Sequence, residues 1–406
     1  MKIFVVGTSN SVMGNKGYIE ALRLEHDVVQ LSSGRTPFYS CMKTIVNHKD
    51  EIESSDLLII DHYINDVNFY GSLLGEPYKE HLKLFYSYLS ALNVNILNLM
   101  FPIQDLEQRE SIDLYHQTKS LCEQHSISVL DLNKFNIPKE FYSDLIHLTH
   151  DVSYALGLSL NKGLSKVDFD NVDFGTVSDF PFYSLSASKI PNNRNKSCTF
   201  KNSLICVEYL KLEHEITVHV PKGHKLIALG LLLDKTMNGR SGFELNDEQS
   251  GVSGGGYFLE TVEQTVCGDF TISPLSGYHE VRNMMGRGIS KGLFTYFYIV
   301  DFLFFDTERN MEFNSAIRKS YNIDISQFIS LSNKFVAIGN REPSFPKISP
   351  KSVNKLRELA LSLEVEDLKI ARDLMLLANL ARPDGPVIKT KLAEYEKALN
   401  GKSKVN

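Results

Sequence analysis

Five short runs of Val, Ile and Leu recur through the first 165 residues, and stretches with helical spacing lie between them. Runs of this kind are typical of strands that are covered on both faces, and the helical stretches supply the crossovers of a parallel sheet. The pattern therefore predicts a three-layer, doubly wound α/β domain over residues 1–165. The strands are expected at residues 2–6, 27–31, 57–60, 95–100 and 128–132, and the clearest helices at residues 78–92, 106–124 and 150–164.

The character of the chain changes after this domain. Residues 166–199 are rich in Asp, Asn, Ser and Pro, which predicts an irregular connector. Strand-like segments broken by turns then predict a β-sandwich over residues 200–345. Its strands are expected at residues 204–210, 215–220, 225–233, 257–262, 269–273 and 295–305. Apolar residues at helical spacing predict a helical hairpin over residues 346–406, closed by a third helix at 387–399.

Composition and charge exclude several classes of protein. A chain of 406 residues is expected to form two or three domains, and 43% hydrophobic with 23% charged residues is typical of a soluble globular protein. The net charge of -6, without a stripe of Lys and Arg, argues against nucleic-acid binding. We expect no transmembrane segment and no secretory signal, and hence a cytoplasmic protein. Five scattered cysteines without a CxxC pair indicate neither a disulfide framework nor a zinc site.

Polar loops follow four of the five expected strands of the α/β domain. In open parallel sheets, ligands bind beyond the carboxyl ends of the strands, because the connecting loops meet there. We therefore expect one shared site at this edge. The loops are Gly7-Thr8-Ser9-Asn10-Ser11, Ser32-Ser33-Gly34-Arg35, Asp61-His62-Tyr63-Ile64-Asn65-Asp66 and Asp144-Leu145-Ile146-His147.

Three of these loop residues have the chemistry of a catalytic triad. A serine in a tight turn between a strand and a helix exposes its hydroxyl, which makes Ser9 the predicted nucleophile. His147 would take the proton from Ser9. Asp144 would accept a hydrogen bond from the imidazole Nδ1–H and stabilise the imidazolium that forms. The sequence thus predicts acyl-ester chemistry at Ser9, Asp144 and His147.

The tetrahedral intermediate of such a reaction carries an oxyanion, which needs N–H donors that are already in place. The predicted donors are the Ser9 N–H, the Gly34 N–H and the side-chain amide of Asn65. Gly34 suits this role because a residue without Cβ lets the backbone approach closely. The predicted substrate-binding residues are Asn10, Arg35, His62 and Asp66.

Each of these residues also has a structural interpretation. Ser9 and Asp144 are good helix caps, and Gly34 suits a turn. Asp144 and His147-x-x-His150 contain the residue types of a metal cluster, but their spacing is not that of a zinc helix and a third ligand is not evident. We therefore expect no metal. The catalytic interpretation gains its weight from the occurrence of all these residues at one edge of one sheet.

At these positions the sequence resembles the SGNH, or GDSL-like, hydrolases. The resemblance covers about the first 165 residues and follows the family's four sequence blocks in chain order. It implies a flavodoxin-like domain of SGNH type in which Ser9 is the nucleophile, Gly34 and Asn65 complete the oxyanion hole, and Asp144 and His147 finish the triad. The blocks are Gly7-Thr8-Ser9-Asn10-Ser11, Gly34, Asn65-Asp66 and Asp144-x-x-His147. Two positions depart from the family: Thr8 stands where Asp is usual, and Tyr63-Ile64 replaces a lead that usually contains Gly.

An α/β domain for ester chemistry joined to a β-sandwich resembles carbohydrate-active enzymes, in which the sandwich holds or shapes the saccharide site. Residues 346–406 are similar to the tetratricopeptide-type helices of bacterial polysaccharide-assembly proteins, which implies association with other assembly enzymes. The resemblance implies serine-dependent acyl transfer on a polysaccharide or oligosaccharide. We expect an O-acetyltransferase for a bacterial capsular or surface polysaccharide, which forms an acetyl-Ser9 intermediate with acetyl-CoA as the donor and has no tightly bound cofactor.

Two other functions stay open at this point. Water in place of the sugar hydroxyl in the second step would make the protein a carbohydrate esterase or deacetylase of the SGNH type. A non-catalytic glycan-binding or scaffold protein would bind glycans without turnover. Transfer is favoured because acetyl-CoA is available in the cytoplasm, whereas hydrolysing fresh acetyl groups from a growing glycan would be wasteful.

Overall fold

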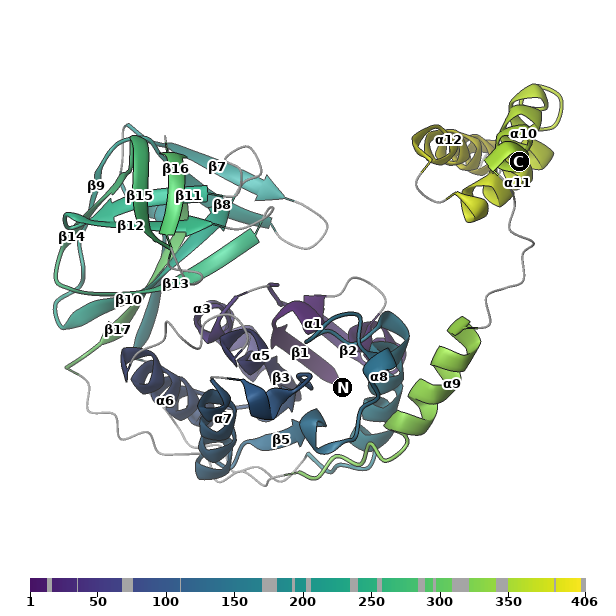
Figure 1. Cartoon of the computed structure of the whole chain (residues 1–406). Coiled ribbons are helices and arrows are strands. Elements are labelled where there is room, and N and C mark those ends of the chain that lie inside the picture. Colours follow the sequence, from purple (N-terminus) through teal and green to yellow (C-terminus); the bar gives the residue numbers. More distant parts are fainter. Residues whose placement is uncertain are drawn as a thin grey trace. The chain divides into compact units, whose positions relative to one another are not determined.

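The chain folds into two compact units, Met1–Val336 and Ala337–Asn406 (Figure 1). The first unit contains the parallel sheet and the β-sandwich, and the second contains the C-terminal helices. The computed structural model describes residues 1–12, 17–34, 36–67, 76–109, 111–169, 181–191, 194–201, 206–233, 240–253, 258–283, 289–294, 297–308, 321–340, 350–382 and 385–402.

A parallel sheet forms the centre of the α/β domain, and among the described residues it has five strands in the order β2-β1-β3-β4-β5. Each pair of neighbouring strands is parallel. β1, β3 and β4 are buried along almost their whole length, as expected for runs of Val, Ile and Leu that are covered on both faces. The strands are β1 (Lys2–Gly7), β2 (Asp27–Gln30), β3 (Leu57–Asp61), β4 (Asn95–Met100) and β5 (Ser128–Asp131).

Helices cover both faces of this sheet (Figure 1). On one face Phe38 of α3 packs on Phe85 of α6, and on the other α2 packs closely on α8. The predicted doubly wound fold is confirmed. The helices are α1 (Ser9–Val12), α2 (Tyr18–Leu22), α3 (Phe38–Asn47), α4 (Lys49–Glu53), α5 (Tyr63–Asn65), α6 (Glu76–Ala91), α7 (Ile112–Gln124) and α8 (His150–Leu164), with 3₁₀ turns η3 (Leu106–Gln108), η4 (Leu132–Lys134) and η5 (Lys139–Phe141).

The predicted β-sandwich is also confirmed, and in the described part of the chain it consists of two six-stranded sheets. One sheet has the order β13-β10-β17-β8-β7 with β6 beside β17, and the other has the order β16-β15-β12-β11-β14-β9. Side chains from both sheets form one apolar core, in which Phe243 of β11 stacks on Phe297 of β17. β12 and β15 pair in parallel, unlike the antiparallel pairs around them.

The sandwich begins earlier than the sequence predicts, because β6 and the first four residues of β7 lie within the expected connector, residues 166–199. Polar residues alternate with half-buried ones in β7, so its composition resembles that of a loop. The bounds are β6 (Phe182–Ser186), η6 (Ala187–Lys189), β7 (Lys196–Lys201), β8 (Cys206–Leu212), β9 (Ile216–Val218), β10 (His224–Leu233), β11 (Arg240–Leu245), β12 (Glu248–Ser253), β13 (Phe258–Cys267), β14 (Phe270–Pro274), β15 (Gly277–Asn283), β16 (Ile289–Phe294) and β17 (Phe297–Asp306).

A buried ion pair joins the α/β domain to the sandwich. Lys43 Nζ of α3 lies 3.2 Å from Asp301 Oδ2 of β17, and each side chain is only 9% exposed. Burial raises the pKa of Asp301, and the neighbouring Lys43 opposes this rise. Apolar residues of β10 and β17, such as Ile227 and Leu303, complete the contact by joining the core of the α/β domain. The sandwich is thus fixed to the helix that follows the Gly34 loop.

After the sandwich the chain returns to the α/β domain. The Tyr321 N–H donates to Ser128 Oγ of β5, and Lys166 pairs with Asp324 at 3.0 Å. α9 (Phe328–Asn340) then begins with Phe328, which is fully buried in the α/β core.

The second unit is a small helical bundle, and its described part has three helices, the predicted hairpin and the third helix that was expected to close it. They are α10 (Pro350–Ser362), α11 (Leu368–Ala381) and α12 (Pro386–Lys402). Ala360, Met375 and Tyr395, one from each helix, meet in its apolar core. No helix in the described portion of the chain is both long enough and apolar enough to span a membrane.

Packing between α2 and α8 requires a glycine in α8. A Cβ atom at Gly157 would lie 2.2 Å from the Tyr18 carbonyl oxygen and 2.6 Å from the Ala21 Cβ. We expect Gly157→Ala to lower the free energy of unfolding by about 2 kcal/mol, because neither neighbour can move without shifting a helix. Urea denaturation measures this change. Lys162→Ala, on the exposed side of the same helix, is the matched control, and equal losses in both variants would contradict the prediction.

Candidate active site

Ser9, His147 and Asp144 form a continuous chain of hydrogen bonds. The Ser9 Oγ and His147 Nε2 are 2.6 Å apart, and the His147 Nδ1 and Asp144 Oδ2 are 2.7 Å apart. The histidine side chain is 23% exposed and the aspartate side chain 55% exposed, so solvent reaches both. The structure thus brings together the three residues that the sequence analysis selected, in the order that nucleophilic catalysis requires.

Asp144 also holds its own loop in place. Its Oδ1 accepts hydrogen bonds from the Ile146 and His147 N–H groups, each at 2.9 Å, while its Oδ2 binds the imidazole. Partial burial raises the pKa of Asp144, but these hydrogen bonds and the nearby imidazole outweigh it and hold the pKa below its usual value. The carboxylate therefore stays ionised at neutral pH, as a group that stabilises a developing imidazolium must.

Two side chains from other loops fix the position of this loop. Asn10 Nδ2 donates to the Ile146 carbonyl at 2.9 Å, and Asn10 Oδ1 accepts from the Leu148 N–H at 3.4 Å. On the other side, Gln104 donates from its N–H to the Leu145 carbonyl at 3.0 Å and from Nε2 to the Asp144 carbonyl at 3.1 Å. Asn10, predicted to bind substrate, is 98% buried, and its amide holds the loop that carries Asp144 and His147.

A buried carboxylate lies beneath the turn that carries Ser9. Asp61 Oδ2 accepts from the Thr8 N–H at 3.3 Å, from Thr8 Oγ1 at 3.1 Å and from Ser11 Oγ at 3.0 Å. Ser11 Oγ in turn lies 2.7 Å from the Tyr18 hydroxyl. Burial raises the pKa of Asp61 to about 6, although its hydrogen bonds act in the opposite direction. Asp61 thus fixes residues on both sides of Ser9.

The predicted oxyanion donors come from loops that contact one another. A methyl group at Gly34 would lie 3.9 Å from the Ser9 Cα, so the Gly34 backbone lies directly beside the nucleophile. Asn65 is fully buried, and its Nδ2 donates to the Thr36 carbonyl at 3.0 Å. Because a side-chain amide carries two N–H groups, Asn65 retains a second donor after this bond. Asn65 therefore ties the third loop to the Gly34 loop.

Two further predicted residues lie in the core rather than facing a substrate. His62 is 1% exposed, and its ring nitrogens contact Asp66 Oδ2 at 3.0 Å and the Tyr86 hydroxyl at 2.8 Å. Asp66 is 2% exposed, and its Oδ1 accepts from the Phe38 N–H at 3.2 Å. Both side chains thus have partners that position the start of α3. Arg35 lies outside the described residues.

Two residues that support the site, Asp61 and Gln104, had no role predicted from the sequence. Asp61 ends a run of apolar strand residues. A carboxylate at such a buried position needs hydrogen-bond donors, which indicates polar groups of the neighbouring loop beside it. Gln104 stands in a loop with no recognised pattern, so its role depends on tertiary contacts alone. Within the described residues, no group of three or more His, Cys, Asp or Glu could hold a metal ion.

The fold and the linked Ser, His and Asp define an α/β domain with a triad of the serine-hydrolase type. No family model matches the sequence, and no curated protein matches it. Three solved structures are similar to the α/β part of this chain, each with a TM-score of 0.33. TesA is 16% identical and the match covers 39% of this chain and 94% of TesA, while a lipase/acylhydrolase from Enterococcus faecalis is 16% identical with 42% of this chain and 100% of that chain covered. A lipolytic protein of the G-D-S-L family from Veillonella parvula is 14% identical, with 41% of this chain and 97% of that chain covered.

The buried carboxylate predicts a pH dependence of stability. The pKa of Asp61 is 3.8 when unperturbed and about 6 in the fold, so its contribution to stability is present below pH 4 and is lost as the pH rises through 6. Asp61→Asn removes this titration and keeps an acceptor for the Thr8 N–H. The stability of wild type relative to Asp61→Asn should fall by about 2 kcal/mol between pH 4 and pH 7. Urea denaturation across this range measures the difference, and a difference independent of pH would contradict it.

Proposed function

We propose that this protein is a serine acyltransferase or esterase that forms an acyl-Ser9 intermediate. The single observation that carries the proposal is the hydrogen-bonded chain from Ser9 through His147 to Asp144. Ser9 Oγ attacks the ester or thioester carbonyl while His147 Nε2 takes its proton. The same proton then passes from His147 to the leaving group, which departs and leaves the acyl group on Ser9. The Gly34 N–H and Asn65 amide would stabilise the oxyanion.

The second step decides the class of enzyme. We propose that acetyl-CoA supplies the acetyl group and that a sugar hydroxyl, deprotonated by His147, attacks acetyl-Ser9. The ester bond to Ser9 then breaks, and His147 returns the proton to Ser9 Oγ. This reaction would be O-acetylation of a bacterial capsular or surface polysaccharide in the cytoplasm. The resemblance of the Ser9, Asn65 and Asp144-x-x-His147 blocks to SGNH hydrolases supports the acyl chemistry, and the attached β-sandwich supports a saccharide as the acceptor.

Hydrolysis is the second candidate function, and the exposure of the triad favours it. Because the side chains of His147 and Asp144 are 23% and 55% exposed, water can reach the imidazole that would activate it. An esterase would release acetate from an acetylated glycan with the same two residues. A glycan-binding protein without turnover would use neither of them.

We further propose that the C-terminal helices associate with other polysaccharide-assembly enzymes. Several large apolar side chains on these helices are exposed, which supports contact with another protein. The most exposed on the helices themselves are Leu359, Ile370 and Val387.

Assays with acetyl-CoA, a panel of capsule-type glycans and aryl acetates test the proposal. A transferase should consume acetyl-CoA only when a glycan is present. It should raise the mass of the glycan by about 42 Da for each hydrogen that an acetyl group replaces. An esterase should instead release acetate from acetylated sugars and phenol from aryl acetates. Both activities should be lost in Ser9→Ala, with Ser197→Ala, an exposed serine in strand β7 of the sandwich, as the control. Turnover that survives Ser9→Ala would refute the proposal.

A further inference from the structure

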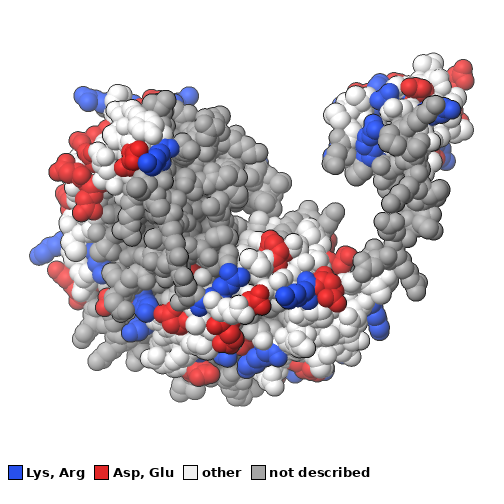
Figure 2. Space-filling view, viewed as in Figure 1, with Lys and Arg blue, Asp and Glu red and all other residues white. Residues whose placement is uncertain are grey.

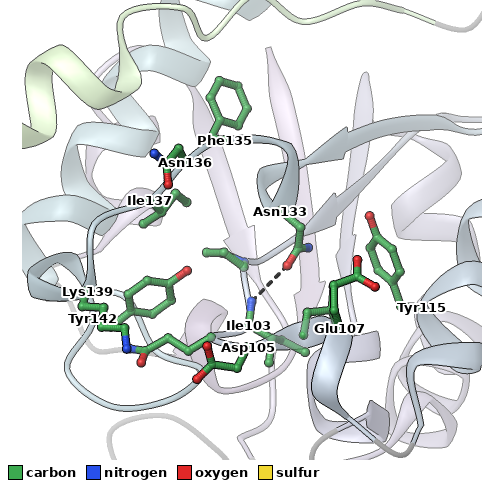
Figure 3. Close-up of a pocket in the computed structure, with 13 residues that line it drawn as sticks. Ile103, Asp105, Glu107, Tyr115, Asn133, Phe135, Asn136, Ile137, Lys139 and Tyr142 are labelled. Atoms are coloured by element: carbon green, nitrogen blue, oxygen red, sulfur yellow. Dashed lines mark hydrogen bonds between the residues drawn. The ribbon is translucent and has the colours of Figure 1, made fainter.

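A groove of about 300 Å³ opens beside the loop that carries Asp144 and His147. Its walls are the segments that follow β4 and β5, residues 102–107 and 133–142, with Tyr115 of α7 (Figure 3). β4 and β5 are neighbours in the sheet, so both segments leave its carboxyl edge, where Ser9 also lies. The groove therefore belongs to the edge at which ligands of such sheets bind.

The groove shares a wall with the catalytic loop. Gln104 lines it and donates to the carbonyl groups of Leu145 and Asp144. Tyr142 also lines it and forms a β-bridge with Leu148, which closes the loop on the far side of His147. A ligand in the groove would lie against the residues that hold the triad in place.

Hydrogen bonds within the protein hold the side chains at the base of the groove in place without a ligand. Asn133 Oδ1 accepts from the Ile103 N–H at 3.0 Å, which joins the two walls (Figure 3). Asn133 Nδ2 donates to the Tyr63 hydroxyl at 2.8 Å. Tyr115 donates its hydroxyl to Asp131 Oδ2 at 2.7 Å. Side chains that are held in this way lose little conformational entropy when a ligand binds.

The lining residues have the chemistry that binds sugars. Carboxylates of Asp105 and Glu107 accept hydrogen bonds from hydroxyl groups, and the exposed Asn136 can donate and accept. The half-buried ring of Tyr142 can pack on the C–H groups of a sugar. Burial raises the pKa of Tyr142 to about 12, so its hydroxyl stays protonated and can also donate a hydrogen bond.

Other ligands fit this lining less well. An acyl chain requires a mostly apolar pocket, and here charged and amide side chains are frequent. An anionic ligand such as CoA would face two carboxylates, Asp105 and Glu107, with Lys139 as the one cation among the described lining residues. Like charges disfavour that approach.

We infer that this groove is the subsite for the neutral saccharide that gives or receives the acyl group. The inference rests on the proposed acyl chemistry at Ser9, and it assigns to the α/β domain itself a role in sugar recognition. Glu107 and Asn136, on opposite walls, would hold hydroxyl groups of the sugar while its ester or free hydroxyl reaches the triad.

The double variant Glu107→Ala with Asn136→Ala tests the inference, because both residues are exposed and hold no other described element. The matched control is Gln108→Ala with Lys134→Ala, a pair of exposed residues that lie close by in sequence but do not line the groove. Steady-state kinetics compare 4-nitrophenyl acetate with a panel of mono-O-acetylated disaccharides. Melting temperature checks the fold, and Glu107→Gln replaces the double variant if the latter is destabilised.

For at least one disaccharide ester, we expect kcat/KM to fall about tenfold or more in the groove variant, mainly through KM, and to change little in the control. Turnover of 4-nitrophenyl acetate, which is too small to need the groove, should stay within twofold of wild type. An equal loss on both substrates would show that these residues support the triad and not the sugar, and would overturn the inference. Unchanged kcat/KM for every disaccharide ester in the groove variant would also overturn the inference, as would a rise in KM for acetyl-CoA alone. A wild-type enzyme that hydrolyses no disaccharide ester with a higher kcat/KM than 4-nitrophenyl acetate would overturn it too. If wild type shows no Ser9-dependent turnover of any ester and no Ser9-dependent consumption of acetyl-CoA with any glycan, the proposed function itself fails.

Discussion

The hydrogen bond between Ser9 Oγ and His147 Nε2 is the contact on which the account of this protein depends. It joins residues that are 138 positions apart in the chain. Only the parallel sheet brings them together, because β1 lies inside it, between β2 and β3, and the loop before α8 folds back over the same carboxyl edge. The order β2-β1-β3 also makes this edge the point at which the strand order reverses, where loops diverge and leave room for a ligand.

The surrounding residues act mainly by restricting this contact to one geometry. Asp61 holds the Ser9 turn from below, Asn10 ties that turn to the loop of His147, and Gln104 braces the loop from the opposite side. Burying a carboxylate such as Asp61 opposes folding, as its raised pKa shows. This cost is compatible with the proposed reaction, which needs a fixed backbone, because catalytic groups lose efficiency when the distances between them vary.

The sequence predicted the parallel sheet well, because each strand is a run of Val, Ile and Leu that must be covered on both faces. It also selected Ser9, Asp144 and His147, because the carboxyl edge of such a sheet gathers its loops. The limits are equally physical. β7 alternates polar and half-buried residues, so its composition does not differ from that of a loop. His62 was predicted to bind substrate, but its ring is buried and contacts the hydroxyl of Tyr86. The two residues are 24 positions apart in the chain, so the contact could not be predicted from the sequence.

Covalent labelling by a fluorophosphonate tests the central contact most directly, because the probe reacts only with a serine whose proton can be taken by a base. Peptide mapping should find one adduct, at Ser9, and His147→Ala should slow its formation by about 10²-fold or more. His150→Ala, which changes an exposed histidine three residues away, should leave the rate unaltered. An adduct at another residue, or labelling of Ser9 at an undiminished rate without His147, would contradict the account.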